Sequence, residues 1–317
     1  LGELNTSHIG FSSFGEEEQV FHGSVTLATG ILFEADNPYV VKRTVRNSPA
    51  FKSESTPETG DRLIRVNGNE VDPDKNRESY FSFPSSMNEI TLTFRRGNSE
   101  FDLKLEPVSY FAVRNLLYDE WMLERQQIVD EQSDERIAYV HMKNMGQGEL
   151  QHFMQEMVQQ GEERDALIFD LRYNTGGNVH DEVLRFLSQR PYLKWGYREG
   201  RLASQSNFTP SAKPIVLLIN EQSLSDAEMT AAGFKELGLG TVMGMETYRW
   251  IIFTSGRGLV DGSSYRLPSW GVYTFEGDNL EFTGVAPDIE IPKTFDDRVN
   301  GRDPQLERAI EYIMEQI

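Results

Sequence analysis

From residue 136 onward, short apolar runs alternate with longer amphipathic segments, and this order constrains the fold more than any other feature of the sequence. The apolar runs are strand-sized and lie at 137–142, 166–171, 214–220 and 240–243. Segments with helical periodicity lie at 148–160, 179–187 and 225–237, and a closing helix carries apolar residues at 306, 310, 313 and 317. Strands joined by helices in this order form parallel sheets covered on both faces, so the sequence predicts an α/β domain over residues 136–317.

Residues 23–108 have a different pattern, in which short alternating or β-branched segments are separated by turn residues. A strand pattern ends here in Asn67-Gly68, and Asn47-Ser48-Pro49-Ala50 resembles the run that opens the short helix of PDZ domains. The block therefore resembles a small β-rich PDZ-like domain, which implies that the backbone of Gly30-Ile31-Leu32-Phe33 accepts a peptide carboxylate beside an open strand edge. A small β-module of another type is the alternative.

Composition and charge exclude several kinds of protein. The chain contains no Cys, which rules out disulfides, thiolate nucleophiles, iron–sulfur clusters and cysteine-based zinc sites. Its 31 basic and 50 acidic residues give a net charge of −19, which repels phosphate backbones, so nucleic acid is not an expected partner. The apolar runs are far shorter than the ~20 residues that span a bilayer. Because the chain starts at Leu1 without a signal segment, we expect it to be a piece of a longer protein.

The first candidate for chemistry lies where a buried strand meets a helix, at Phe169-Asp170-Leu171-Arg172-Tyr173-Asn174-Thr175-Gly176-Gly177. Loops at the carboxyl ends of parallel strands carry reactive groups, and helix N-termini offer free N–H groups. Glycines there let a ligand approach the backbone, whose N–H groups stabilise developing negative charge. Phosphate binding is the competing interpretation, although the chain has neither Gly-Lys-Ser/Thr nor Gly-x-Gly-x-x-Gly.

The second candidate follows the next strand, at Asn220-Glu221-Gln222-Ser223-Leu224-Ser225-Asp226-Ala227-Glu228. A helix that begins around Asp226 places Ser225 at its N-terminus, where the partial positive charge favours an alkoxide-like oxygen. The same residues also match an ordinary helix N-cap box, which is a purely structural interpretation. The local sequence leaves both interpretations open.

A serine nucleophile needs a base, either a histidine or a desolvated lysine. Among the five histidines, His141, His152 and His180 lie in predicted strands or helices, where a structural role is the simpler interpretation. None has the spacing of metal ligands, and we expect neither a metal nor a cofactor. His8 differs, because it ends the polar, turn-like run Leu1-Gly2-Glu3-Leu4-Asn5-Thr6-Ser7-His8, where a core histidine would be unusual.

The N-terminal Ser-His run, the PDZ-like block, the glycine pair and the Ser225 turn together resemble the C-terminal processing peptidase superfamily and, within it, the tricorn-like serine peptidases. Processing peptidases pair the serine with a lysine in the strand after the next turn, where this chain has Tyr248-Arg249-Trp250. The nearest lysine is Lys235, on the predicted helix itself, which disfavours a Ser–Lys dyad. Tricorn-like enzymes instead take a histidine from before the PDZ module, in a motif similar to Glu3-Leu4-Asn5-Thr6-Ser7-His8.

The resemblance assigns catalytic roles to four residues of this chain. It implies that Ser225 is the nucleophile and His8 the general base, and that Ser7 orients the imidazole. Glu281, in Glu281-Phe-Thr-Gly-Val285, then completes a Ser-His-Ser-Glu tetrad. In such a tetrad the histidine takes the serine proton as Oγ attacks a peptide carbonyl, and its neighbours stabilise the imidazolium.

The resemblance also implies how the substrate is held. The N–H groups of Gly177 and Asp226 form the oxyanion hole, and Gly176 lines the binding site. The acidic group that tricorn uses for basic P1 side chains aligns with 192–198, where this chain has no acid. Trp195 and Tyr197 in that segment favour an apolar pocket instead.

At the level of the whole chain, the resemblance implies a ClpP/crotonase-like catalytic fold, a hexameric homo-oligomer and a cytoplasmic location. Peptides or unfolded proteins are the expected substrates. The expected division is an N-terminal segment of the catalytic core at 1–22, the PDZ-like domain at 23–108, a helical connector at 109–135 and the α/β serine peptidase domain at 136–317.

Two hypotheses from different classes follow. The first is a serine endopeptidase that cleaves short or unfolded peptides. The second is a catalytically degenerate scaffold that binds peptides through its PDZ-like module, for which Trp250 in place of a basic residue is the motivation. A hydrolase that uses a pair of carboxylates is permitted by the many acids, but no spacing supports it.

Overall fold

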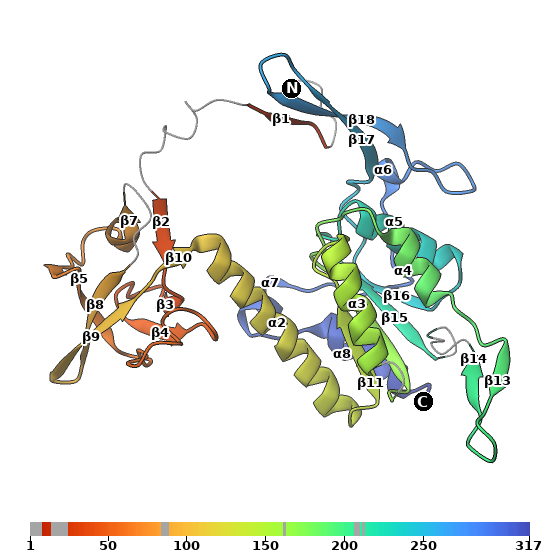
Figure 1. Cartoon of the computed structure of the whole chain (residues 1–317), viewed down its shortest axis with the longest axis horizontal. Helices are drawn as coiled ribbons and strands as arrows, with labels where there is room; N and C mark the ends of the chain where they lie inside the picture. The colour runs from red at the N-terminus through yellow and green to blue at the C-terminus, as the bar shows by residue number, and fades with distance from the viewer. Residues whose placement is uncertain (1–7, 14–24, 84–88, 161–162, 206–209, 211–212) are drawn as a thin grey trace. The chain divides into compact units, whose positions relative to one another are not determined.

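A computed structural model describes residues 8–13, 25–83, 89–160, 163–205, 210 and 213–317 (Figure 1). The chain forms two compact units. The larger one combines Leu1–Phe14 with Arg125–Ile317, and the smaller one is Gly15–Glu124. No helix in the described ranges is long and apolar enough to cross a membrane.

The larger unit is built on a five-stranded sheet in which every neighbouring pair of strands is parallel. In spatial order the strands are β11 (Ile137–His141), β12 (Ala166–Asp170), β15 (Ile215–Ile219), β16 (Thr241–Gly244) and β19 (Ile289–Glu290). The helices between them are α3 (Gln147–Gln160), α4 (His180–Leu187) and α5 (Asp226–Glu236). The predicted α/β class with a parallel sheet is therefore confirmed.

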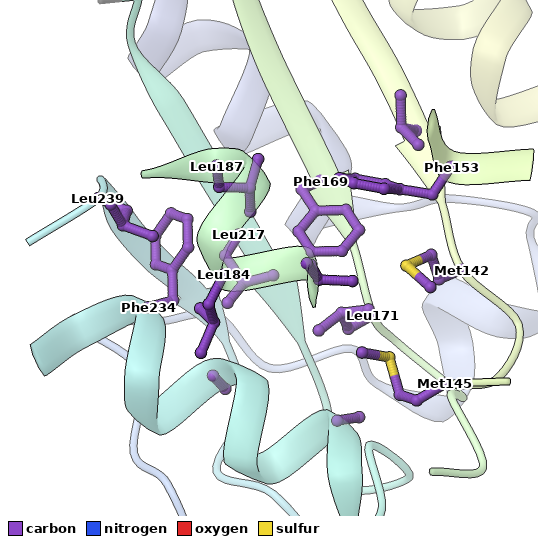
Figure 2. Packing of buried hydrophobic residues seen from close by; sticks show 14 of the residues in the cluster. Met142, Met145, Phe153, Phe169, Leu171, Leu184, Leu187, Leu217, Phe234 and Leu239 are labelled. Atoms are coloured by element: carbon purple, nitrogen blue, oxygen red, sulfur yellow. The ribbon is translucent and has the colours of Figure 1, made fainter. Parts of the chain in front are cut away.

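Both faces of this sheet are buried, which explains why its strands are uninterrupted apolar runs. On one face Phe169 of β12 packs with Phe153 of α3, at 5.2 Å between ring centroids, and Phe234 of α5 belongs to the same cluster (Figure 2). The neighbouring residue, Ile168, points to the other face and packs in a cluster with Leu306 of α8 (Pro304–Met314). Successive strand residues thus supply two separate cores, as the two-residue period of a strand requires.

Parallel pairing brings the carboxyl ends of β12 and β15 to the same edge of the sheet. The two loops that follow are joined there by hydrogen bonds. Leu224 N donates to Asn174 O at 2.9 Å, and Ser223 Oγ donates to Leu171 O at 2.8 Å. The two junctions singled out in the sequence therefore lie side by side.

Several elements of the larger unit have no counterpart in the predicted series. An antiparallel sheet pairs β18 (Ser264–Gly271) with β1 (Gly10–Ser12) on one side and β17 (Ile252–Gly258) on the other. A separate hairpin joins β13 (Leu193–Trp195) to β14 (Ala203–Gln205). Two short helices, α6 (Leu280–Thr283) and α7 (Phe295–Val299), are also outside that series. These strands are mostly exposed, so they lack the long apolar runs that mark the parallel sheet.

The smaller unit is β-rich and has its own core, in which Leu63, Leu92 and Phe94 are fully buried. Its sheets consist of β6-β5-β8-β9, β3-β4 and β10-β2-β7. Its described strands are β2 (Val25–Ala28), β3 (Ile31–Phe33), β4 (Val41–Thr44), β5 (Arg62–Val66), β6 (Asn69–Glu70), β7 (Ser82–Phe83), β8 (Ile90–Arg96), β9 (Ser99–Leu105) and β10 (Val108–Ser109), and η2 (Arg77–Phe81) is a 3-10 helix. Residues 47–53, where the PDZ resemblance placed the start of a helix, form turns.

A 24-residue helix, α2 (Tyr110–Ser133), follows the last of these strands. Its first part belongs to the smaller unit and its second part, from Arg125, to the larger one. In the larger unit Val129 of α2 is fully buried in the same cluster as Leu306 of α8. The helix therefore spans most of the stretch expected to connect the two domains.

Candidate active site

Ser225 lies in the turn between β15 and α5, as the residue directly before the helix. Its backbone has φ 54° and ψ −112°, a combination that is strained for a residue with a Cβ. Such strain persists only where the surrounding structure enforces it, and it is concentrated at functional sites. The turn thus holds the Ser225 hydroxyl at the N-terminal tip of α5, where N–H groups are free.

His8 reaches this hydroxyl from the other end of the chain. Its Nε2 lies 3.2 Å from Ser225 Oγ, across 217 positions in the sequence. The strand β1 begins two residues after His8 and pairs with β18, with Gly10 opposite Arg266. This antiparallel pairing anchors the N-terminal segment so that the imidazole can meet the serine.

The surroundings of His8 favour its neutral form. Burial is the main cause that lowers its pKa below the ordinary value of 6.5, and the positive charge of Arg266 lowers it further. The carboxylate of Glu281, on α6, acts in the opposite direction and raises the pKa. The ring of Trp250 covers the imidazole, with 4.6 Å between the two centroids. A neutral imidazole is the form that can accept a proton from serine.

A fully buried carboxylate, Glu228, joins the nucleophile to the segment that carries Trp250. Its Oε1 accepts the N–H of Ser225 at 2.9 Å and the N–H of Trp250 at 2.8 Å. Its Oε2 accepts the hydroxyl of Thr247 at 2.5 Å and the N–H of Arg249 at 2.9 Å. Burial raises the pKa of Glu228, and these hydrogen bonds oppose that rise. The expected N-cap contact and a catalytic Ser225 are therefore compatible, because Glu228 binds the backbone of Ser225 and leaves Oγ to His8.

The glycine pair packs directly against this turn. Gly176 has φ +80°, and a Cβ on it would lie 2.7 Å from Ser225 Cβ. A Cβ on Gly177 would lie 2.0 Å from the carbonyl oxygen of Met145. Contacts that short are impossible for real side chains, so only glycine fits at either position. The backbone of this loop can therefore approach the serine as closely as a substrate carbonyl requires.

Two backbone donors are available beside Ser225. In the described part of the chain, neither the N–H of Gly177 nor that of Asp226 donates to an acceptor. A Cβ built on Gly176 would lie 3.3 Å from Asp226 N, which shows how close the glycine loop comes to the tip of α5. A pair of unused N–H groups next to a nucleophile is the arrangement that stabilises an oxyanion.

Comparison with known proteins identifies the family that the sequence of this domain matches. Residues 136–291 match the model of Peptidase family S41. The chain carries a peptidase family S41 domain. The match covers the parallel sheet from β11 to β19 together with Ser225 and Glu281.

The similarity to known proteins extends over nearly the whole chain. The chain is 30% identical to a putative tricorn protease homolog 2 of Streptomyces coelicolor, over 99% of its own length and 28% of the relative's. It is 26% identical to the tricorn protease of Thermoplasma acidophilum, over 100% of its own length and 30% of the relative's. A crystal structure of the tricorn protease superposes with a TM-score of 0.70 at 24% identity, covering 97% of this chain and 28% of that one. The chain thus spans less than a third of the length of these relatives.

Behind the glycine loop, the larger unit contains a buried ion-pair network. The guanidinium of Arg172 donates to Asp170 at 2.7 Å and to Asp303, the N-cap of α8, at 2.6 Å. Tyr139 donates its hydroxyl to Asp170 at 2.9 Å. The guanidinium holds the pKa of both carboxyl groups below the usual range against the effect of burial. The network anchors the base of the loop that carries Gly176.

Three other predicted site residues are not placed beside Ser225 by the structure. Ser7 lies outside the described residues, so its hydroxyl stays a prediction. Trp195 and Tyr197 lie on or next to the β13–β14 hairpin, 52% and 74% exposed, and Figure 1 shows this hairpin well away from β1 and β18. The structure does not bring these two aromatic residues to Ser225.

Three further residues lie at the site, and the sequence assigns a catalytic role to none of them. Trp250 serves only to motivate the scaffold hypothesis, and its ring lies 4.6 Å from the ring of His8. Glu228 belongs to the capping box and His180 is a structural histidine in the prediction; the first binds Ser225 N and the second the Asp226 side chain. The signal for Glu228 was its position three residues after Ser225, the spacing of a capping box. No metal-binding group of three or more His, Asp or Glu side chains occurs in the ranges that the structure covers.

Proposed function

We propose that this chain is the catalytic part of a serine endopeptidase that hydrolyses short or unfolded peptides. The observation that carries the proposal is the 3.2 Å approach of His8 Nε2 to Ser225 Oγ across 217 sequence positions. Ser225 is the nucleophile and His8 the general base. Ser7 and Glu281 complete the tetrad, and the field of Glu281 at His8 supports the second of these assignments.

The reaction follows from the charges around the pair. His8 takes the proton of Ser225 as Oγ attacks the substrate carbonyl carbon, and the resulting imidazolium is stabilised by the negative charge of Glu281. His8 then returns the proton to the leaving amine, and the same base activates water for hydrolysis of the acyl-enzyme. Burial lowers the pKa of His8 and so favours the neutral base between these steps.

The oxyanion that forms in each addition step is held by the N–H groups of Gly177 and Asp226. Neither N–H donates to an acceptor among the described residues, and one of them is the first N–H of α5, where the helix dipole also favours negative charge. Each donor of this kind is typically worth about 10²–10³ in rate.

The substrate class and assembly are proposed from the relatives, whose names describe tricorn proteases. Peptides are the proposed substrates, and the absence of an acid in 192–198 disfavours a Lys or Arg preference at P1. The same proposal includes a ClpP/crotonase-like core and a PDZ-like fold for residues 23–108. It also includes a hexameric homo-oligomer and a cytoplasmic location.

Labelling with a fluorophosphonate tests the nucleophile directly. We expect one covalent adduct, located at Ser225 by peptide mass mapping, because the probe reacts only with a serine activated by a base and an oxyanion hole. The His8→Gln variant is expected to label at least ~10²-fold more slowly, since general-base catalysis contributes a factor of about 10²–10⁴ to the rate. No adduct on correctly assembled protein would favour the scaffold hypothesis.

The pH dependence of kcat/KM tests the electrostatics of His8. The acid limb reports the deprotonation of the base, and since the pKa of His8 is lowered, activity should persist to a pH below 6.5. Replacing Arg266 with Gln removes a charge that lowers this pKa, so the limb should move to higher pH. Replacing Glu281 with Gln removes a charge that raises it, so the limb should move to lower pH.

Arg257, on the neighbouring strand β17, provides a matched control for the Arg266 variant. It lies opposite Tyr265, and Arg266 is the arginine whose charge lowers the pKa of His8, so replacing Arg257 with Gln should move the limb less than replacing Arg266. Shifts of the same sign in the Arg266 and Glu281 variants would contradict the proposed surroundings of the base.

A further inference from the structure

We propose that His180 is a positioning residue, which holds the Asp226 side chain so that the two oxyanion-hole donors keep their places. This inference rests on the proposed peptidase function and adds a residue that neither the tetrad nor the oxyanion hole includes. His180 begins α4, and Asp226 begins α5 directly after the nucleophile. The two residues lie 46 positions apart in the sequence.

The contacts of the Asp226 carboxylate carry the argument. Its Oδ2 accepts the N–H of Val179 at 2.7 Å and the N–H of His180 at 3.1 Å. Its Oδ1 meets His180 Nδ1 at 2.5 Å. The side chain of Asp226 is only 3% exposed, so its carboxylate depends on donors from the protein for its hydrogen bonds. A buried carboxylate with three partners is held in one orientation.

This carboxylate links the two segments that supply the oxyanion hole. Gly177 provides one donor, and Val179, two residues later, is bound by Asp226 Oδ2. The other donor is the N–H of Asp226 itself. A shift of the Asp226 side chain therefore changes the spacing between the donors, and a misplacement of about 1 Å can cost about 10²-fold in rate.

The surroundings of His180 also favour its protonated form. A cation at the first position of a helix is opposed by the helix dipole. Among the described residues, the charged groups that act on His180 are nonetheless acidic: Asp226 from α5, and Asp181 and Glu182 from its own helix. The hydrogen bond to Asp226 is the main cause that raises the pKa of His180 above 6.5, and burial opposes it. The imidazole ring is only partly exposed, yet open enough to exchange protons with solvent.

Protonation of His180 thus strengthens the link. An imidazolium–carboxylate hydrogen bond is about twice as strong as one between neutral groups. Because the folded-state pKa is raised, this contribution is fully present below 6.5 and is lost as pH rises through the folded value. The peptidase should therefore lose part of its kcat on the alkaline side, at a pH above 6.5.

Two variants of His180 separate positioning from simple packing. His180→Ala removes the partner of Asp226 and should lower kcat about 10-fold, less than the ~10²–10³ of a deleted donor, with KM changed less than about twofold. His180→Asn places an amide N–H where Nδ1 stands and cannot titrate. It should recover most of the lost kcat and remove the alkaline decline.

His152 provides the matched control. It is a half-exposed histidine on α3 with a carboxylate, Glu156, 3.9 Å away, and it lies outside the site. His152→Ala should leave kcat, KM and the alkaline limb unchanged. Thermal unfolding of each variant identifies any that fails to fold, in which case His180→Asn and its pH profile decide.

Each result has a definite meaning. A His180→Ala variant within twofold of the parent at every pH would overturn the positioning role, as would a His180→Asn variant that keeps the alkaline decline. Either outcome would leave the peptidase itself intact, because the parent chain would still hydrolyse peptides and label at Ser225. A parent chain that neither hydrolyses peptides nor labels would remove the proposed function and this inference together.

Discussion

Replacing Ser225 with Ala is expected to lower the hydrolysis of unstructured peptides by about 10⁴-fold or more, because loss of the nucleophile leaves only binding and the oxyanion hole. The fold should survive, since the backbone N–H of residue 225 still donates to Glu228 and the substitution removes only the hydroxyl that meets His8. The measurement is kcat/KM on a fluorogenic peptide, with circular dichroism to verify the fold.

A serine outside the site supplies the control for this variant. Ser188, at the end of α4, donates its hydroxyl to Leu184 O at 2.6 Å and lies outside the site. Ser188→Ala should keep full activity. Undiminished turnover by Ser225→Ala would show that another group is the nucleophile and would refute the proposed mechanism.

The second large effect concerns stability. Replacing Arg172 with Met is expected to destabilise the larger unit by about 3–5 kcal/mol, because it leaves two buried carboxylates without their main partner. Arg172 is fully buried and pairs with both Asp170 and Asp303. The measurement is urea unfolding at pH 7, followed by circular dichroism. Activity should fall as well, since the network supports the loop that carries Gly176.

The pH dependence of this effect has a definite sign. In the parent chain the pKa of Asp170 is held well below its ordinary value of 3.8, so its contribution to stability is present above that value and is lost as pH falls through the folded pKa. Without Arg172, burial raises the pKa of Asp170, and protonation then relieves the unpaired charge. The stability deficit of the variant should therefore be largest near neutral pH and should shrink on acidification.

An exposed ion pair provides the comparison. Arg136 donates to Asp165 at 2.8 Å, but the two side chains are 39% and 54% exposed. Arg136→Met should cost at most about 1 kcal/mol, the usual limit for a surface pair. Equal losses for the two arginine variants would contradict a special role of the buried network.

The parallel sheet could be predicted closely because its signal is local. Strands buried on both faces must be apolar at every position, and the segment Ile215–Ile219 illustrates the rule, since all five residues are buried. The antiparallel sheet formed by β1, β17 and β18 could not be found in this way. Its strands are mostly exposed and contain Gly and Pro, so neither periodicity nor composition distinguishes them from loops.

The candidate site could be predicted only in part. The glycine pair and Ser225 have local signatures, since both lie where a buried strand gives way to a helix. His8 and Glu281 were found through resemblance, because no local property distinguishes them from surface residues. The contact of Trp250 with His8 could not be predicted, because the two residues lie at distant positions in the chain.

By itself, then, the sequence determined the first four strands of the parallel sheet and the helices between them, the class of the sheet and the two loops where chemistry could occur. These follow from properties of neighbouring residues: apolarity, periodicity and the small size of glycine. The tertiary structure alone decided that His8 meets Ser225, that Glu228 binds the backbone around both Ser225 and Trp250, and that His180 meets Asp226. Contacts of this kind join residues that are distant along the chain, and only the pairing of strands and the packing of helices bring them within hydrogen-bonding distance.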